Sequence, residues 1–159
     1  MIVVCINGSI NSGKSTVARA LAARLEKARF LEGDDHDGHH LPFDEMVSTA
    51  IERLAREIRR DAVHERLVMA YPLRDEDFAA LDKAARERGA TLLVVTLAPP
   101  LDVVLGQRGK RVLDAGETER IREMYAEGYH ARPFSSLIVD GTPSVAEVVA
   151  RIEEWLGAR

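Results

Sequence analysis

Short apolar runs alternate along the chain with longer segments whose apolar residues recur at helical spacing. The short runs predict strands at residues 2–6, 29–32, 67–71, 91–97 and 136–139. The helical spacing predicts helices at about residues 14–28, 43–61, 76–88, 101–107 and 144–156. Because apolar strands alternate with helices, the pattern predicts an α/β fold: three α/β/α layers with a central five-stranded parallel sheet.

Each of three helices carries an apolar stripe that is expected to face this sheet. The expected inward residues are Val17, Leu21 and Leu25 in the first helix; Met46, Ile51, Leu54 and Ile58 in the second; and Val145, Val148, Val149, Ile152 and Trp155 in the last. A chain of 159 residues is long enough to bury one core. No repeat or linker divides it, so we expect a single domain over residues 1–159.

Composition and charge restrict the possible partners. A formal net charge of −4 gives no electrostatic reason to expect nucleic acid. The single cysteine, Cys5, excludes a disulfide within the chain and is expected to be a small buried apolar residue. No apolar run has the length of a membrane span, and the first strand begins at residue 2, leaving no room for a signal peptide. These features predict a cytoplasmic monomer or homodimer without a membrane partner.

Between the first strand and the first helix, residues 8–16 read GSINSGKST, a complete G-x-x-x-x-G-K-[ST] phosphate loop. In this context main-chain N–H groups and the helix N-terminus face phosphates, Lys14 reaches the β- and γ-phosphates, and Ser15 ligates Mg²⁺. The loop predicts nucleoside triphosphate binding by Gly8, Ser9, Asn11, Ser12, Gly13, Lys14, Ser15 and Thr16.

The rest of the sequence favours ATP over GTP. The chain lacks an Asn/Thr-Lys-x-Asp segment after a late strand, where small regulatory GTPases read guanine. At the corresponding place, residues 140–144 (DGTPS) could contact a base only through main-chain groups. The chain is too short for a motor or transporter ATPase. A small kinase using ATP and Mg²⁺ remains.

Phosphoryl transfer to an alcohol also needs a carboxylate beside the attacking hydroxyl. In a parallel sheet the functional residues follow the carboxyl ends of the strands. Asp34 follows the second strand and stands beside the phosphate loop if that strand lies next to the first; there it can orient the hydroxyl and accept its proton. The alternative for Asp34 is an acid that caps a helix or lies in a turn. His36 is a candidate substrate contact. The spacing of His36, His39 and His40 matches no zinc signature.

The phosphate loop, the sequence FLEGD at residues 30–34, and an arginine-bearing segment after the fourth strand together resemble the small P-loop kinases that include shikimate, gluconate and adenylylsulfate kinases. Residues 31–34 are most similar to gluconate kinases. The resemblance implies that Glu32 joins Ser15 at Mg²⁺ and that Asp34 holds the substrate hydroxyl. It also implies a lid segment at about residues 108–129, with Arg108 or Arg111 as the catalytic arginine.

The segment after the third strand departs from the shikimate kinase pattern. Shikimate kinases have a glycine run there, whereas this chain has AYPLR at residues 70–74. Shikimate is therefore not favoured, and Tyr71 and Arg74 are candidates to contact a different substrate or parts of a structural turn. Arg56, Arg59 and Arg60 either hold an anionic substrate or form an exposed helix face. Arg120 and Arg122 are further lid candidates within an exposed helical surface.

Three functions are compatible with these residues. The first is an ATP- and Mg²⁺-dependent kinase, similar to shikimate or gluconate kinase, that phosphorylates a hydroxyl of a small polar metabolite. The second is a nucleoside or nucleotide kinase, favoured if the arginines at 56–60 bind a phosphate and Tyr71 stacks on a base. The third is a nucleotide-binding regulator without turnover, which has no need of Lys14, Asp34 and a lid arginine together.

Overall fold

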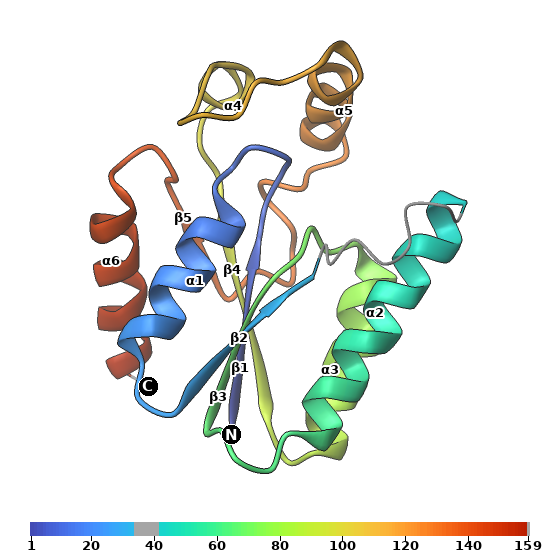
Figure 1. Cartoon of the computed structure of the whole chain (residues 1–159), viewed down its shortest axis with the longest axis vertical. Coiled ribbons are helices and arrows are strands. Elements are labelled where there is room, and N and C mark those ends of the chain that lie inside the picture. Colours follow the sequence, from blue (N-terminus) through green and yellow to red (C-terminus); the bar gives the residue numbers. More distant parts are fainter. Residues whose placement is uncertain (34–41, 159) are drawn as a thin grey trace.

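A five-stranded parallel sheet organises the computed structural model of this chain, which describes residues 1–33 and 42–158 (Figure 1). The strands are β1 (Ile2–Asn7), β2 (Ala28–Glu32), β3 (Arg66–Ala70), β4 (Thr91–Leu97) and β5 (Leu137–Val139). Their order in the sheet is β2-β3-β1-β4-β5, with β1 pairing β3 from Ile2↔Arg66 and β4 from Ile2↔Thr91. The central position of β1 places the loop that follows it in the middle of the carboxyl edge.

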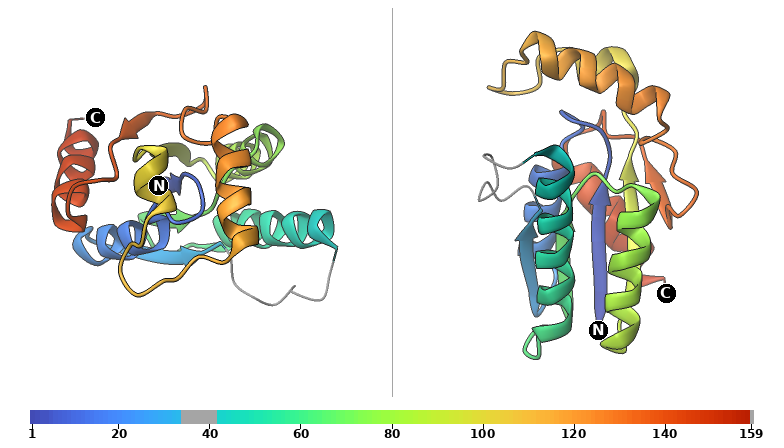
Figure 2. Two further views of the ribbon diagram at one scale, coloured as in Figure 1. Left: turned by 90° about the horizontal axis from the view of Figure 1, so that it is seen from above. Right: turned by 90° about the vertical axis from the view of Figure 1, so that its right-hand side faces the viewer.

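Helices cover both faces of the sheet, as the sequence pattern predicts (Figures 1 and 2). Two of them, α1 (Lys14–Arg24) and α6 (Val145–Gly157), pack on one face, while α2 (Phe43–Arg60) and α3 (Asp75–Glu87) pack on the other. The remaining helices, α4 (Leu101–Leu105) and α5 (Ala115–Ala126), lie beyond the carboxyl edge. The prediction of a three-layer α/β/α domain is confirmed. Within the described residues, no helix has both the length and the apolar character needed to span a bilayer.

The sheet separates two apolar cores. Successive side chains of a strand point to opposite faces of the sheet, so they pack in different cores. In β1, Val3 and Cys5 pack with α2 and α3, whereas Val4 and Ile6 pack with α1 and α6. This double burial explains why the strands read as nearly continuous apolar runs. Burial raises the pKa of the Cys5 thiol to about 12, so Cys5 is the small buried residue that the sequence predicts.

Element ends differ from the predicted ones where the backbone turns sharply. Helix α1 ends at Arg24, four residues before the predicted end, because Leu25 already has an extended backbone (φ −82°, ψ 130°). Lys27 then adopts a left-handed φ of 52°, and the chain enters β2 at Ala28. Leu25 is then the residue that caps α1 rather than a residue within it. The expected inward orientation of Val145 is wrong, since this first residue of α6 is 38% exposed and lines a cavity.

A buried carboxylate joins three elements at the amino edge of the sheet, opposite the phosphate loop. Asp61, whose side chain is 3% exposed, accepts hydrogen bonds from the main-chain N–H groups of Val63 (3.1 Å) and His64 (2.9 Å). It also contacts the His64 ring at 2.9 Å and Arg29 of β2 at 3.4 Å, and its carbonyl accepts from Arg88 after α3. Burial alone would raise the pKa of Asp61, but the bonds from His64 and Val63 outweigh it and lower the pKa from 3.8 to about 2.

This depressed pKa predicts a specific acid sensitivity. A carboxylate with a lower pKa in the folded chain stabilises the fold above its unfolded pKa, and that contribution disappears as the pH falls toward 2. Between about pH 5 and pH 2, we expect the free energy of unfolding of the wild type to fall by about 2 kcal/mol more than that of Asp61→Asn. Urea denaturation across this range measures the difference. Glu52→Gln, an exposed acid of α2, should track the wild type; identical slopes for Asp61→Asn and wild type would contradict the prediction.

Candidate active site

The phosphate loop is built on backbone conformations that only some residues tolerate. Gly8 has a φ of 145°, and a Cβ there would lie 2.8 Å from the Leu97 carbonyl oxygen, so glycine is required. Gly13, with a φ of 96°, turns the chain into α1. Asn11 is also left-handed, with a φ of 61°, and its amide donates to the carbonyl of Val104 at 2.7 Å, which ties the loop to α4.

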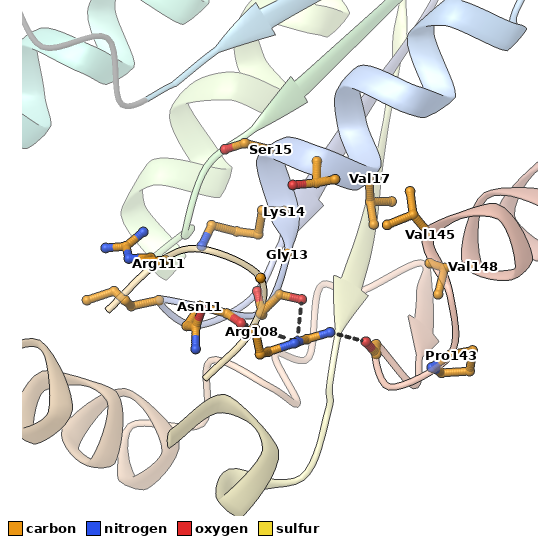
Figure 3. A pocket seen from close by; sticks show the side chains of 15 residues that line it. Asn11, Gly13, Lys14, Ser15, Val17, Arg108, Arg111, Pro143, Val145 and Val148 are labelled. Carbon is orange, nitrogen blue, oxygen red and sulfur yellow. Dashed lines mark hydrogen bonds between the residues drawn. The ribbon is translucent and has the colours of Figure 1, made fainter. Parts of the chain in front are cut away.

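The amino end of α1 is arranged to meet an anion. No side chain caps it and its first turn holds no acidic residue, whereas α5 and α6 both begin with carboxylate-containing capping boxes. Its first N–H groups carry the positive end of the helix dipole and lie beside the Lys14 ammonium. Lys14 is 8% exposed, and its Nζ donates to the Ser9 carbonyl at 2.7 Å, so the ammonium lies over the loop (Figure 3).

Ser15 and Glu32 come together from different elements. The Ser15 hydroxyl donates to Oε1 of Glu32 at 3.0 Å, and Oε2 lies 3.7 Å from Arg19, one turn further along α1. Hydroxyl and carboxylate oxygens are ligands that suit Mg²⁺, which takes few protein ligands beside phosphates and water. Among the described residues no group of three or more His, Cys, Asp or Glu could hold a metal. The Ser15–Glu32 pair therefore fits a metal shared with a bound triphosphate.

The sequence interpretation of Asp34 considered adjacent first and second strands, and the position of β2 excludes that arrangement. The second strand does not lie next to the first, because β3 is inserted between them. Contact between Glu32 and the phosphate loop arises instead through α1, whose first turn reaches the end of β2. Asp34 and His36, the predicted base and substrate contact, lie outside the described residues, so their roles stay predictions.

A cavity of about 470 Å³ extends from the phosphate loop toward α6 (Figure 3). Loop residues and the start of α1 line one part of it, including Asn11, Lys14 and Ser15. Arg108, Gly109 and Arg111 line it from the segment after α4. The remaining lining comes from the connection between β5 and α6 and from α6 itself, namely Gly141, Pro143, Val145 and Val148.

Arg108 joins two walls of this cavity. Its guanidinium donates to the carbonyls of Asn11 and Ser12, both at 3.2 Å, and to the carbonyl of Gly141 at 2.6 Å (Figure 3). These bonds hold the guanidinium between the phosphate loop and the β5–α6 connection. Arg108 is thus fixed by main-chain acceptors, in contrast to an exposed basic turn.

Arg111 lines the cavity, where Figure 3 shows its side chain on the same side as that of Lys14. It forms an ion pair with Glu117 of α5. Its side chain is 53% exposed. The other arginines considered for the lid are paired on α5 itself, Arg120 with Glu123 and Glu127, and Arg122 with Glu119. Of the four, Arg108 and Arg111 line the cavity.

The candidates after β3 do not line this cavity. Tyr71 is 5% exposed and packs in the core with α2 and α3. Arg74 is the N-cap of α3 and pairs with Asp77 at 2.9 Å, and this hydrogen-bonded pairing raises the pKa of its guanidinium. On the α2 face, Arg59 pairs with Glu87 at 2.7 Å. In this structure Arg74 and Arg59 therefore pair with carboxylates on α3 and lie away from the cavity.

Asn7 is a buried residue that the sequence interpretation missed. Its Nδ2 donates to Thr96 Oγ1 of β4 at 2.9 Å and to the carbonyl of Tyr129 at 3.3 Å, and its Oδ1 accepts from the Leu73 N–H at 3.0 Å. The last residue of β1 thus ties the segments after β3, in β4 and after α5 to the base of the phosphate loop. An amide at the end of an apolar strand was the only signal in the sequence.

Comparison with solved structures defines the fold, although no family model and no curated protein sequence matches the chain. A gluconokinase from Sinorhizobium meliloti 1021 superposes with a TM-score of 0.72 at 20% identity, over 98% of this chain and 95% of that one. An APS kinase from Mycobacterium tuberculosis, in complex with AMPPNP and APS, gives 0.68 at 21% identity over 98% and 96%. A shikimate kinase from Aquifex aeolicus gives 0.61 at 19% identity over 98% and 96%. The chain therefore has the fold of the small P-loop kinases, as the resemblance in its motifs implied.

The Asn7 network makes a stability prediction. Asn7→Leu leaves the N–H of Leu73, the hydroxyl of Thr96 and the carbonyl of Tyr129 without this partner, and we expect it to lower the free energy of unfolding by about 2–4 kcal/mol. Thr96→Val should cost about 1–2 kcal/mol, and the double variant less than the sum, because the two residues share a hydrogen bond. Urea denaturation provides all three values. A wild-type midpoint for Asn7→Leu, or strict additivity, would contradict the network.

Proposed function

We propose that this protein is an ATP- and Mg²⁺-dependent kinase that transfers the γ-phosphoryl group to a hydroxyl of a small polar metabolite. One observation carries the proposal: a cationic phosphate end and a partly apolar end belong to the same cavity. The phosphate end has Lys14, the uncapped start of α1 and the Ser15–Glu32 pair. The other end has Arg108, Pro143 and Val145. A nucleoside triphosphate has this same polarity.

At the phosphate end, each group has a separate task. The main-chain N–H groups of residues 9–16 bind the phosphate oxygens, and Lys14 leaves the Ser9 carbonyl to neutralise the β- and γ-phosphates. Ser15 and Glu32 hold Mg²⁺, which when bound neutralises charge on the triphosphate. Bonds that these groups form more strongly with the charge of the transition state accelerate the transfer.

At the other end, a purine base lies between the guanidinium of Arg108 and the apolar side chains of Pro143, Val145 and Val148. A guanidinium held flat by three carbonyls has a π-face for stacking, and the valines bury the opposite face of the base. Main-chain groups of residues 140–144 then contact the edge of the base. Such contacts distinguish ATP from GTP only weakly.

The two arginines that line the cavity, Arg108 and Arg111, have different proposed roles. Because the guanidinium of Arg108 already donates to three carbonyls, we assign it to the base. Arg111 is exposed, near Lys14 and held only by a surface ion pair with Glu117, so it is the better candidate to stabilise charge on the transferred phosphoryl group. Asp34 remains the proposed base for the acceptor hydroxyl.

The alternative of a nucleoside or nucleotide kinase has less support. That function would be favoured if Tyr71 stacked on a base and the arginines of α2 clamped a phosphate. Tyr71 is instead buried between helices, and Arg59 is paired with Glu87. The gluconokinase and shikimate kinase among the structural neighbours are named for small hydroxylated acids, which supports a polar metabolite without identifying it.

A screen of sugars, sugar acids, polyols, nucleosides and nucleotides for ATP consumption tests the proposal. We expect turnover with a polar metabolite, and Lys14→Ala should reduce it by two or more orders of magnitude, about 3 kcal/mol, while the fold persists. Lys83→Ala, an exposed lysine of α3, is the matched control. Mg·ATP binding without turnover on any class would support a regulator, and no binding of Mg·ATP or Mg·GTP to folded protein would reject the proposal.

Arg111→Ala tests the assignment of the transfer arginine. We expect kcat to fall by about 10²–10³-fold, because the interaction forms with charge that develops during transfer, while the affinity for Mg·ATP changes less than about threefold. Single-turnover kinetics and calorimetry separate the two effects. Arg122→Ala, an exposed arginine of α5 paired with Glu119, should retain wild-type values. An equal loss in both variants, or a loss confined to ATP affinity, would remove Arg111 from the transfer step.

A further inference from the structure

Arg53, in the middle of α2, donates hydrogen bonds to the main chain at the end of β2. One nitrogen of its guanidinium, Nη2, lies 2.7 Å from the carbonyl oxygen of Glu32 and 3.0 Å from that of Gly33. The side chain is half-buried, so these charge-assisted bonds are protected from water. An arginine placed on two consecutive carbonyls fixes a stretch of backbone.

The end of β2 is a place where such fixing matters. Strand β2 lies at the edge of the sheet and is hydrogen-bonded only to β3. On the β3 side, the Gly33 N–H donates to the Ala70 carbonyl at 3.1 Å, and a Cβ on Gly33 would lie 2.4 Å from that oxygen. Arg53 holds the carbonyls of the same two residues from α2. The backbone of Glu32 and Gly33 is thus held from two directions.

This backbone carries the carboxylate that faces Ser15. Glu32 reaches the Ser15 hydroxyl at 3.0 Å from a strand two positions away from β1 in the sheet. A shift of the strand end would move the carboxylate away from α1. The bonds from the Arg53 guanidinium to the Glu32 and Gly33 carbonyls oppose such a shift.

We propose that Arg53 is a positioning residue for the Mg²⁺ site: it holds the end of β2 so that Glu32 and Ser15 can share the metal. The inference rests on the proposed use of Mg·ATP. It assigns to α2 a part in nucleotide binding, although α2 does not line the nucleotide cavity.

A double-mutant cycle tests this coupling by calorimetry, without any acceptor or turnover. The measured quantity is the Mg²⁺ gain, the ratio of the ATP dissociation constant in EDTA to that at saturating Mg²⁺. We expect Arg53→Met and Glu32→Gln each to reduce this gain by about tenfold, as loss of a group that orients a metal ligand typically does. The double variant should match Glu32→Gln within about twofold, because Arg53 acts through Glu32. ATP affinity in EDTA should change little.

Arg56→Met, one helical turn further along α2 and exposed, is the matched control and should retain the wild-type gain. If Arg53→Met does not fold, Arg53→Lys takes its place in the cycle and should keep part of the gain, because an ammonium retains the charge but not the planar guanidinium. An unchanged gain, or losses that multiply in the double variant, overturns the inference. Wild-type protein that binds no ATP refutes the proposed function instead, whereas wild-type binding without a Mg²⁺ gain refutes the metal assignment and this inference together.

Discussion

The site depends on leaving the start of one helix without an internal acceptor. Main-chain N–H groups at the beginning of α1 have no side-chain cap and no nearby acidic residue in the first turn, while the neighbouring helices α5 and α6 satisfy theirs with capping boxes. That arrangement costs stability in the empty protein, since capping typically contributes about 1 kcal/mol. Gly8 and Gly13 allow the loop to bring these groups together, and the central strand β1 places them in the middle of the carboxyl edge. An anionic ligand bound at this helix end would accept hydrogen bonds from these N–H groups.

Buried polar contacts hold the loops around the start of α1. A hydrogen bond requires a particular direction, whereas apolar packing does not. Asn7 joins three segments beneath the phosphate loop, and Tyr125 of α5 donates its hydroxyl to the Pro99 carbonyl after β4. The two apolar cores determine that the sheet and helices pack, whereas these bonds determine where each loop leaves the sheet. The bonds of Asn7 therefore both stabilise the fold and position the loops of the site.

Arginine has several distinct roles in this chain. Arg53 and Arg108 donate to main-chain carbonyls, Arg74 donates to the carboxylate of Asp77 at the start of α3, and Arg111 remains exposed beside the cavity. A guanidinium can do each of these because its planar donors fit carbonyls and carboxylates equally well. In the linear sequence these four residues look alike, and only their acceptors in the folded chain distinguish a residue that fixes the backbone from one that can meet a substrate.

The sequence by itself determined the alternation of strands and helices, the three layers and the phosphate loop, because these depend on local spacing and on a motif whose glycines, lysine and serine all lie within residues 8–15. The resemblance of its motifs also paired Glu32 with Ser15, and the two side chains meet through α1 although β3 separates β2 from β1. Tertiary structure alone decided the strand order, the buried role of Asn7, the outward face of Val145 and the acceptors of Arg53 and Arg108. Those features join residues up to 122 positions apart, and no periodicity in a chain encodes which distant carbonyl a guanidinium will meet.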